Sequence, residues 1–327
     1  MTPEARIDAV AAFGFTPRQA RFLVTVTLHG GYCLRRQYEA FAGIRYGKNV
    51  RAFLDRLVAI GLADRFRIRA DRGHVYHIHG RSLYNALGQE DNRNRRPASP
   101  AQIARKLMLL DIVIGRPDVS WYATEQDKVD LFVRQFHVPL DVLPRRMADH
   151  DVTGDSRTAR YFVEKRPIYV TGEPPVPHFV YLATDGSRDG FVAFLRDHVR
   201  LFEQLPRWTV VVVGPSRWTS LAAVFEHWVA SSSTAASALS QDLRWYFERR
   251  SIVEQGNLAQ VPVSDLRRFR QLQQQLSTHD HESRYTTWLA SHGVAGASAS
   301  PVRSVGSVLV EALPFAYQQF GSLPGVA

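Results

Sequence analysis

Three histidines within six residues are the first feature of this sequence that could do chemistry. His74, His77 and His79 lie in the stretch DRGHVYHIHG, residues 71–80. Imidazole is the commonest protein ligand for zinc and copper, so the spacing raises the hypothesis of a metal site. Such a site would also need supporting carboxylate or thiolate groups, and the surrounding elements decide whether these are present.

Other candidates for chemistry are weaker. Residues 210–220, VVVVGPSRWTS, join a strand to a helix as a phosphate loop does, but they lack its Gly-Lys-Ser/Thr signature. Residues 278–282, THDHE, offer four potential metal ligands, yet residues two apart on a helix do not share a face. Cys33 is the single cysteine, and we expect a small buried core residue there. We therefore predict no catalytic residue, no metal site and no cofactor.

The composition is that of an ordinary globular protein large enough for two domains. Of 327 residues, 45% are hydrophobic and 22% are charged. No run of 18 apolar residues exists, which predicts no membrane span and no membrane partner. One cysteine excludes an internal disulfide, and the N-terminal MTPEARIDAV has no secretion signal pattern. We expect a cytoplasmic bacterial protein.

The positive charge is concentrated in the first third of the chain. Residues 1–110 hold 19 Lys and Arg against 8 Asp and Glu, a net charge of +11. The rest of the chain holds 22 against 23, a net of −1. Such asymmetry favours a polyanionic partner for the first third, and double-stranded DNA is the leading expectation.

This basic region has the pattern of three helices followed by a hairpin. Thr16 and Pro17 mark the start of a first helix, and Gly30-Gly31 marks its end. A short helix follows over residues 34–43. The third helix, within YGKNVRAFLDRLVAIGLA, gathers its apolar side chains on one side: Val50, Phe53, Leu54, Leu57 and Val58. Residues 64–79 then alternate as a β-hairpin does.

The phrase RLVAIGLADR, residues 56–65, resembles prokaryotic winged helix-turn-helix proteins. The resemblance implies that the third helix enters the major groove of DNA. Its expected DNA-facing residues are Arg45, Tyr46, Lys48, Asn49, Arg51 and Ala52. Arg35, Arg36 and Gln37, at the start of the second helix, are expected to contact backbone phosphates. From the hairpin we add Arg65, Arg67, Arg72 and His77.

The hairpin pattern also bears on the three histidines. A loop of Asp71-Arg72-Gly73 predicts that Arg67 lies opposite His77 and Arg65 opposite His79. A divalent ion between arginines, with no carboxylate on that face, is a poor metal site. The same arrangement predicts that DNA affinity rises as the pH falls from about 7.5 to 6, because phosphate favours the protonated imidazole.

Four segments make up the predicted domain organisation. They are a winged helix over 1–88, a linker over 89–100, an α/β domain over 101–234, and a helical C-terminal region and tail over 235–327. The third segment predicts a mixed sheet covered by helices, with a strand over 159–170 and a fully buried strand at WTVVVVG. Residues 294–306, VAGASASPVRSVG, have mostly small side chains, and an apolar tail follows them.

The layout of the second domain resembles the restriction-endonuclease-like core, which has a helix, a three-strand meander, a helix and a strand. Replication-relaxation-type proteins of plasmids and mobile elements are similar in joining a winged helix to such a domain. That core carries an Asp on one strand and a Glu-x-Lys on the next to hold a metal ion. Here Glu164 and Lys165 are adjacent, so they would point to opposite faces of a strand. A degenerate, non-catalytic core is the expectation.

Three hypotheses for function remain open. The leading one is a non-enzymatic DNA-binding protein that serves regulation, replication or defence of a mobile element. Its C-terminal region would supply a partner contact or self-association into an oligomer. The second is a metal-dependent nuclease in the C-terminal domain. The third is a structural adaptor that uses the winged helix to contact protein.

Overall fold

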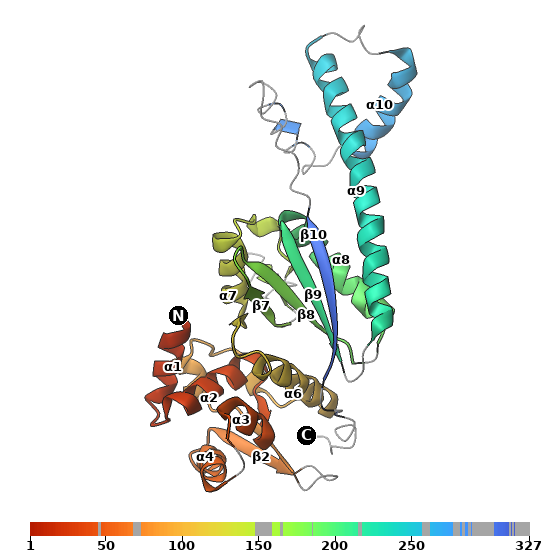
Figure 1. Ribbon diagram of the computed structural model, residues 1–327. Helices are drawn as coiled ribbons and strands as arrows, with labels where there is room; N and C mark the ends of the chain where they lie inside the picture. The colour runs from red at the N-terminus through yellow and green to blue at the C-terminus, as the bar shows by residue number, and fades with distance from the viewer. Residues whose placement is uncertain are drawn as a thin grey trace. The chain divides into compact units, whose positions relative to one another are not determined.

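Figure 1 shows the computed structural model of the chain, a mixed fold of helices and β-sheets. It describes all residues except 45–46, 68–72, 148–158, 164–165, 185, 215–217, 257–261, 277–281, 283–284, 287–288, 290–303, 314, 316 and 318–327. The chain divides into two compact units, one of residues 1–222 with 304–327 and one of residues 223–303. Among the described helices, none combines the length and apolar character that a bilayer span requires.

Four helices begin the larger unit. They are α1 (Pro3–Ala11), α2 (Pro17–His29), α3 (Arg35–Ala42) and α4 (Lys48–Ala59). The predicted start of α2 is confirmed, because the Thr16 hydroxyl accepts a hydrogen bond from the Gln19 amide and the Gln19 side chain accepts one from the Thr16 amide. The apolar sides of α2 and α4 meet in a core that includes Phe22, Leu23, Phe53 and Leu57.

A small antiparallel sheet follows these helices, in the order β1-β3-β2. Its strands are β1 (Tyr32–Leu34), β2 (Ala63–Arg67) and β3 (His74–Ile78). The paired positions of the hairpin include Ala63–Ile78, Arg65–Tyr76 and Arg67–His74. The predicted pairing of Arg67 with His77 is therefore wrong by three positions, and an odd shift moves side chains to the opposite face. The alternation misled because β3 is the central strand and is buried on both faces.

The segment predicted as a linker is instead packed into the larger unit. It contains the end of the turn after α5 (Arg81–Ala86), the short helix η1 (Arg93–Arg95) and the start of α6 (Pro100–Ile114). Asn94 is only 4% exposed, and its side-chain amide donates a hydrogen bond to the Thr27 carbonyl at 3.1 Å. The Ala98 amide donates to the Tyr32 hydroxyl at 3.0 Å. The polar composition of this segment hid these buried contacts.

The larger sheet has five strands in the order β10-β9-β8-β7-β4 (Figure 1). They are β4 (Ser120–Tyr122), β7 (Ile168–Thr171), β8 (Val176–Leu182), β9 (Arg207–Gly214) and β10 (Val305–Ala312). Strands β4, β7 and β8 form an antiparallel meander, whereas β8, β9 and β10 run parallel. Helix α8 (Arg188–Gln204) makes the crossover between β8 and β9. The fully buried strand predicted at WTVVVVG is confirmed, because residues 208–214 are all buried.

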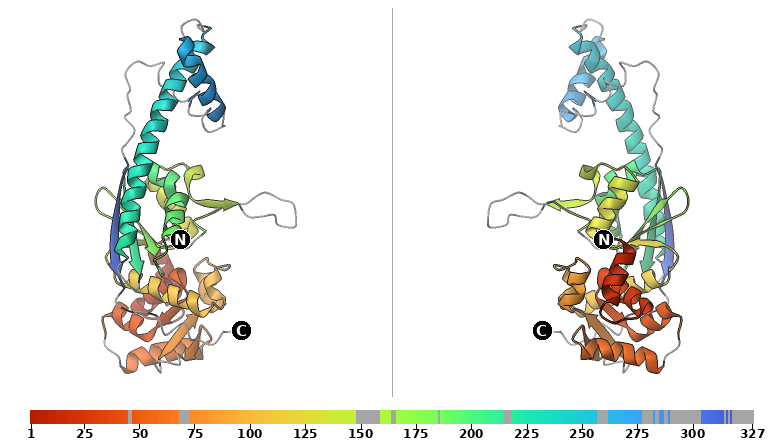
Figure 2. Two further views of the ribbon diagram at one scale, coloured as in Figure 1. Left: turned by 90° about the vertical axis from the view of Figure 1, so that its right-hand side faces the viewer. Right: turned by 90° about the vertical axis from the view of Figure 1, so that its left-hand side faces the viewer.

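The region between β4 and β7 differs from the prediction. It holds α7 (Glu125–Asp130), η2 (Leu131–Gln135), η3 (Leu140–Val142), β5 (Arg145–Met147) and β6 (Ala159–Tyr161). Instead of one strand over 159–170, two short strands occur at the ends of that range, and they belong to different sheets. Strands β5 and β6 pair with each other as a two-stranded ribbon that is separate from the five-stranded sheet (Figure 2).

Strand β10 corrects the prediction that residues 235–327 are only a helical region and a tail. It lies beside β9 in Figure 1, with Leu309 opposite Val211. The smaller unit therefore lies in the sequence between two neighbouring strands of one sheet. Helix α9 (Thr219–Glu254) runs from the larger unit into the smaller one, which also holds α10 (Val263–Gln275). Apolar residues predicted on these helices do pack together in one cluster that includes Tyr246, Phe269, Leu272 and Leu276.

Candidate nucleic-acid interface

Helix α4 has one buried side and one exposed side. Val50, Phe53, Leu54 and Leu57 are at most 2% exposed, as their spacing predicts. The exposed positions are Lys48, Asn49, Arg51, Ala52, Asp55, Arg56 and Ala59. Gly47 precedes the helix, so its first turn has no capping side chain. A helix start of this kind, with basic side chains beside it, suits a phosphate group. Arg45 and Tyr46 lie outside the described residues.

The hairpin places further basic side chains beside α4. Arg65 on β2 reaches Asp55 on α4, with 3.2 Å between Nη1 and the carboxylate oxygen. Both side chains are about half exposed, so this ion pair contributes little stability and is readily exchanged for a phosphate contact. Arg67 is exposed at the end of β2, opposite His74. Burial, followed by the charges of Arg65 and Arg67, lowers the pKa of His74. Arg72 lies outside the described residues.

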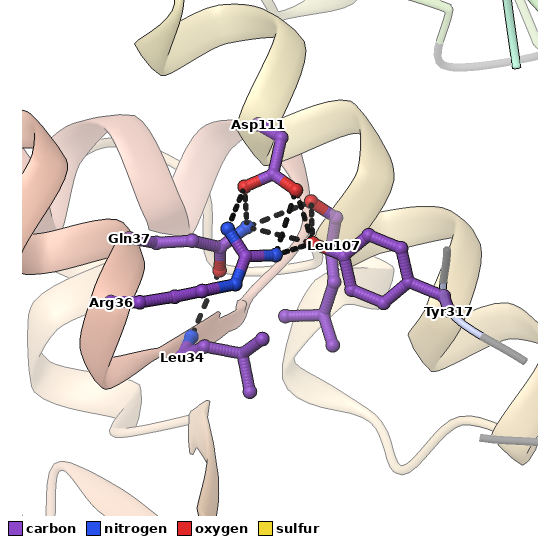
Figure 3. Close-up of polar contacts among 6 residues, drawn as sticks. All are labelled: Leu34, Arg36, Gln37, Leu107, Asp111 and Tyr317. Carbon is purple, nitrogen blue, oxygen red and sulfur yellow. Dashed lines mark hydrogen bonds and ion pairs between the residues drawn. The ribbon is translucent and has the colours of Figure 1, made fainter. Parts of the chain in front are cut away.

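Arg36 and Gln37 are predicted to contact phosphates, but their side chains instead bond to groups of the protein itself (Figure 3). Gln37 is fully buried; its side-chain oxygen accepts from the Leu34 amide, and its nitrogen donates to the Leu107 carbonyl and to Asp111. The Arg36 guanidinium donates two hydrogen bonds of 2.9 Å to the Asp111 carboxylate. Sequence reasoning placed both residues at the start of a helix correctly but could not tell that α6 covers them.

The C-terminal segment completes this polar cluster. The Tyr317 hydroxyl contacts both Asp111 and Arg36, and the Arg36 guanidinium lies 3.6 Å from the centre of the Phe315 ring. Desolvation alone would lower the pKa of Arg36, but its hydrogen bonds to Asp111 raise that pKa overall. Burial, and then the Asp111 charge, raises the pKa of Tyr317. Arg35, by contrast, is exposed and forms an ion pair with Glu39 on the next turn of α3.

His77, predicted as a DNA contact, is also an internal residue and is only 3% exposed. Its ring stacks on Tyr32, with centroids 4.1 Å apart and planes at 3°. Its Nε2 lies 2.9 Å from the Asn94 carbonyl oxygen, so that nitrogen carries a proton and donates. Burial lowers the pKa of His77 to about 4. His77 therefore stays neutral between pH 7.5 and 6, and the predicted rise in DNA affinity loses its basis in this residue.

The distances between the histidines of β3 and their neighbours bear on the hypothesis of a metal site. His79 lies 3.1 Å from the Asp64 carboxylate, and its ring centroid is 5.4 Å from that of His77. Within the described part of the chain, no three His, Cys, Asp or Glu side chains converge as metal ligands. Cys33 is fully buried, and burial raises the pKa of its thiol to about 12, in agreement with a core role.

Part of the basic excess in residues 1–110 has structural partners. Arg6 makes a bidentate ion pair with Asp127 at 2.8 and 2.9 Å. Arg56 donates to the carbonyls of Gly14 and Phe13, and Arg95 donates to the Glu90 carbonyl. A count of charges from the sequence therefore overstates the exposed positive surface. Five exposed residues on α4 and β2 form what we name the α4–β2 basic surface: Lys48, Asn49, Arg51, Arg65 and Arg67.

Two residues of the Arg36 cluster went unrecognised in the sequence. Asp111 is a lone charge in the apolar stretch LMLLDIVI, a pattern that signals a buried ionic partner. Tyr317 lies in an apolar tail and gives no such signal.

No protein-family model, curated protein or solved structure matches this chain. The resemblance to winged-helix proteins therefore stays a prediction.

Proposed function

We propose that this chain binds double-stranded DNA through a winged helix-turn-helix formed by α2, α3, α4 and the β2–β3 hairpin. Helix α4 is the recognition helix of this proposal, and the hairpin is the wing. The observation that carries it is the α4–β2 basic surface. Its five residues are exposed on adjoining elements, whereas the apolar side of α4 is buried.

The chemistry of these side chains suits two kinds of contact. Asn49 can pair with an adenine edge, and Lys48 with the acceptors of guanine or with phosphate. Arg51, Arg65 and Arg67 supply charge for the backbone phosphates, which position a protein without reading sequence. Arg36, Gln37 and His77 take no part, because their contacts lie inside the protein.

A salt titration of DNA binding tests this proposal. Four cationic contacts predict a slope of about −3 to −4 when the logarithm of affinity is plotted against that of salt concentration. The measurement is fluorescence anisotropy of a labelled duplex between about 50 and 200 mM salt. Absence of binding at the low-salt end, or affinity that ignores salt, would overturn the proposal.

We propose that the α/β part serves partner contact or assembly rather than catalysis. The β4–β7–β8 meander, α8 and β9 follow the element order of the restriction-endonuclease-like core. That core holds its metal on two adjacent strands, but β7 and β8, IYVT and VPHFVYL, contain no Asp, Glu or Lys. Glu164 and Lys165 lie outside the described residues. Magnesium- or manganese-dependent cutting of a plasmid, lost in Glu164→Ala, would favour the nuclease alternative.

An adaptor role makes the opposite prediction for nucleic acid. Such a protein would co-purify with a protein partner and shift no duplex, even at low salt. Self-association through the C-terminal region is tested by sedimentation of the full chain with and without DNA. The proposed role in a mobile element is based on the resemblance of the domain layout to replication-relaxation-type proteins.

A further inference from the structure

A cavity of about 710 Å³ lies in the larger unit, between the segment around η1, helix α6, the end of β8 and the start of α8. Its volume is in the range of pockets that enclose small molecules. Five basic side chains line it: Arg93, Arg96, Arg105, Lys106 and Arg166. No Asp or Glu occurs among the described lining residues. Glu164, Lys165 and Asp185 are near in sequence but lie outside the described residues.

The charge imbalance distinguishes this cavity from its neighbour. The adjoining cavity of about 890 Å³ shares Arg93 and Val163 with it, but its lining mixes acidic with basic residues, including Glu90, Asp91 and Glu125. Arg93, Arg96 and Arg105 have no ion-pair partner within the described part of the chain. Gathering like charges around one space is unfavourable unless an anion offsets them.

Internal contacts hold two of the cations in place. Lys106 Nζ lies 3.3 Å from the Asn94 side-chain oxygen and 5.1 Å from the centre of the Tyr32 ring. The Arg166 guanidinium lies 4.6 Å from the Tyr181 ring centre and 4.7 Å from that of Phe194. Both side chains are therefore ordered before any ligand arrives, which lowers the entropy lost on binding.

The rest of the lining suits a phosphate ester. Thr184 and Ser187 bring hydroxyl groups, and Leu109, Pro97 and Leu182 bring apolar surface. Arginine is the side chain best matched to phosphate, because its planar fork donates two parallel hydrogen bonds. Apolar walls beside the cations leave room for the organic part of the ligand.

We propose that this cavity binds phosphate groups, carried either by a free nucleotide or by a nucleic-acid strand. The site is distinct from the α4–β2 basic surface, since the two share no residue. It does not depend on the winged-helix proposal.

The test uses the full chain, with inorganic pyrophosphate and ATP titrated by calorimetry and a labelled single-stranded oligonucleotide followed by anisotropy. The double variant Arg96→Glu/Arg105→Glu should weaken binding of the preferred probe at least about tenfold. Its matched control is Arg21→Glu/Arg81→Glu, which makes the same charge change at exposed positions outside the cavity and should change affinity less than about twofold. Circular dichroism checks that both variants fold.

The probes distinguish the two sources of phosphate. Tighter binding of ATP than of the oligonucleotide assigns a free nucleotide; the reverse, with pyrophosphate as a weak competitor, assigns a strand. Binding of duplex DNA should change equally in the two double variants, because neither alters the α4–β2 basic surface, so failure of this site and failure of the winged-helix proposal are separable. No binding of any probe at low salt, or equal loss of probe binding in the two double variants, would overturn the proposal.

Discussion

Asp111 on α6 holds Arg36 on α3 through two hydrogen bonds of equal length, 2.9 Å. This pair joins the helix before α4 to the helix that begins the α/β part. Gln37 and Tyr317 bind the same carboxylate, so one acidic side chain connects three segments that are distant in the sequence. The proposed DNA-binding region and the five-stranded sheet therefore share a polar junction.

Asp111→Ala should destabilise the larger unit by about 2–4 kcal/mol, because it leaves a partly buried guanidinium and two other donors without their acceptor. Chemical denaturation with the tryptophan signal measures this loss. Asp55→Ala, which removes an exposed partner of Arg65, is the control and should cost less than about 1 kcal/mol. Equal losses in the free energy of unfolding would mean that the contacts of Asp111 stabilise the protein no more than an exposed ion pair does.

Substitutions at exposed and internal positions should separate DNA binding from folding. Lys48→Ala and Asn49→Ala should each weaken binding to a preferred duplex by roughly 1–3 kcal/mol, and loss of Asn49 should relax the sequence preference. Arg67→Ala should weaken binding to all sequences alike and lower the salt slope by about 1. Gln37→Leu should lower stability but leave the affinity of the folded fraction unchanged, since Gln37 is fully buried. If Gln37→Leu weakens DNA binding as much as Lys48→Ala does, the assigned surface is wrong.

The buried His77 should make stability depend on pH. Its pKa in the folded protein is about 4, while a histidine in the unfolded chain titrates near 6.5. Between these values the unfolded chain binds more protons, so the free energy of unfolding falls as the pH drops from about 6.5 toward 4. For this residue the loss at pH 5 is roughly 1–2 kcal/mol.

His77→Phe keeps a ring to stack on Tyr32 and removes the titration, so the acid-side loss should shrink. The rest of the acid-side loss should persist, because burial also lowers the pKa values of His29 and His198 to about 3. The control is His227→Gln at an exposed position. Denaturation curves at several pH values measure the effect, and an unchanged pH profile in His77→Phe would contradict it.

Strand β10 offers a test of the larger sheet. A Cβ at Gly306 would lie 2.4 Å from the Trp208 ring, which itself stacks on Phe202 with centroids 3.8 Å apart. Gly306→Ala should therefore cost about 1–3 kcal/mol, because the tryptophan has to move. Val305→Ala, at a side chain that is 54% exposed, should change thermal stability little. An unaffected Gly306→Ala would argue against the pairing of β10 with β9.

Local patterns predicted the elements whose stability is mostly local. The capped start of α2, the two-sided helix α4 and the buried strand β9 follow from caps and periodicity alone. The register of the hairpin could not be obtained this way, because both faces of β3 are buried and one of them is covered by α6. Gln37 and His77 are polar residue types that usually lie at the surface, yet tertiary packing buries both.

Tertiary contacts also explain the misplaced boundaries. Asn94 lies in a polar segment typical of a linker, but its side-chain amide bonds to the Thr27 carbonyl of α2. Strand β10 is a half-exposed alternation, and it forms a strand because it pairs with β9, which is far away in the sequence. The basic residues of the candidate site could be predicted from their residue types. Which of them are exposed and which bond inside the protein could not, because Arg36 is held by Asp111 on α6.

The pairing of β10 with β9 also has a consequence for biosynthesis. Roughly 90 residues separate Gly214 from Val305, so this contact closes a long loop and belongs to the slow, non-local steps of folding. Until residue 305 and those after it have been synthesised, one edge of the apolar strand β9 has no neighbour to bond. A ribosome-bound chain that stalls within the inserted unit thus displays a row of unpaired amides and carbonyls, which is a substrate for chaperones and a template for aggregation.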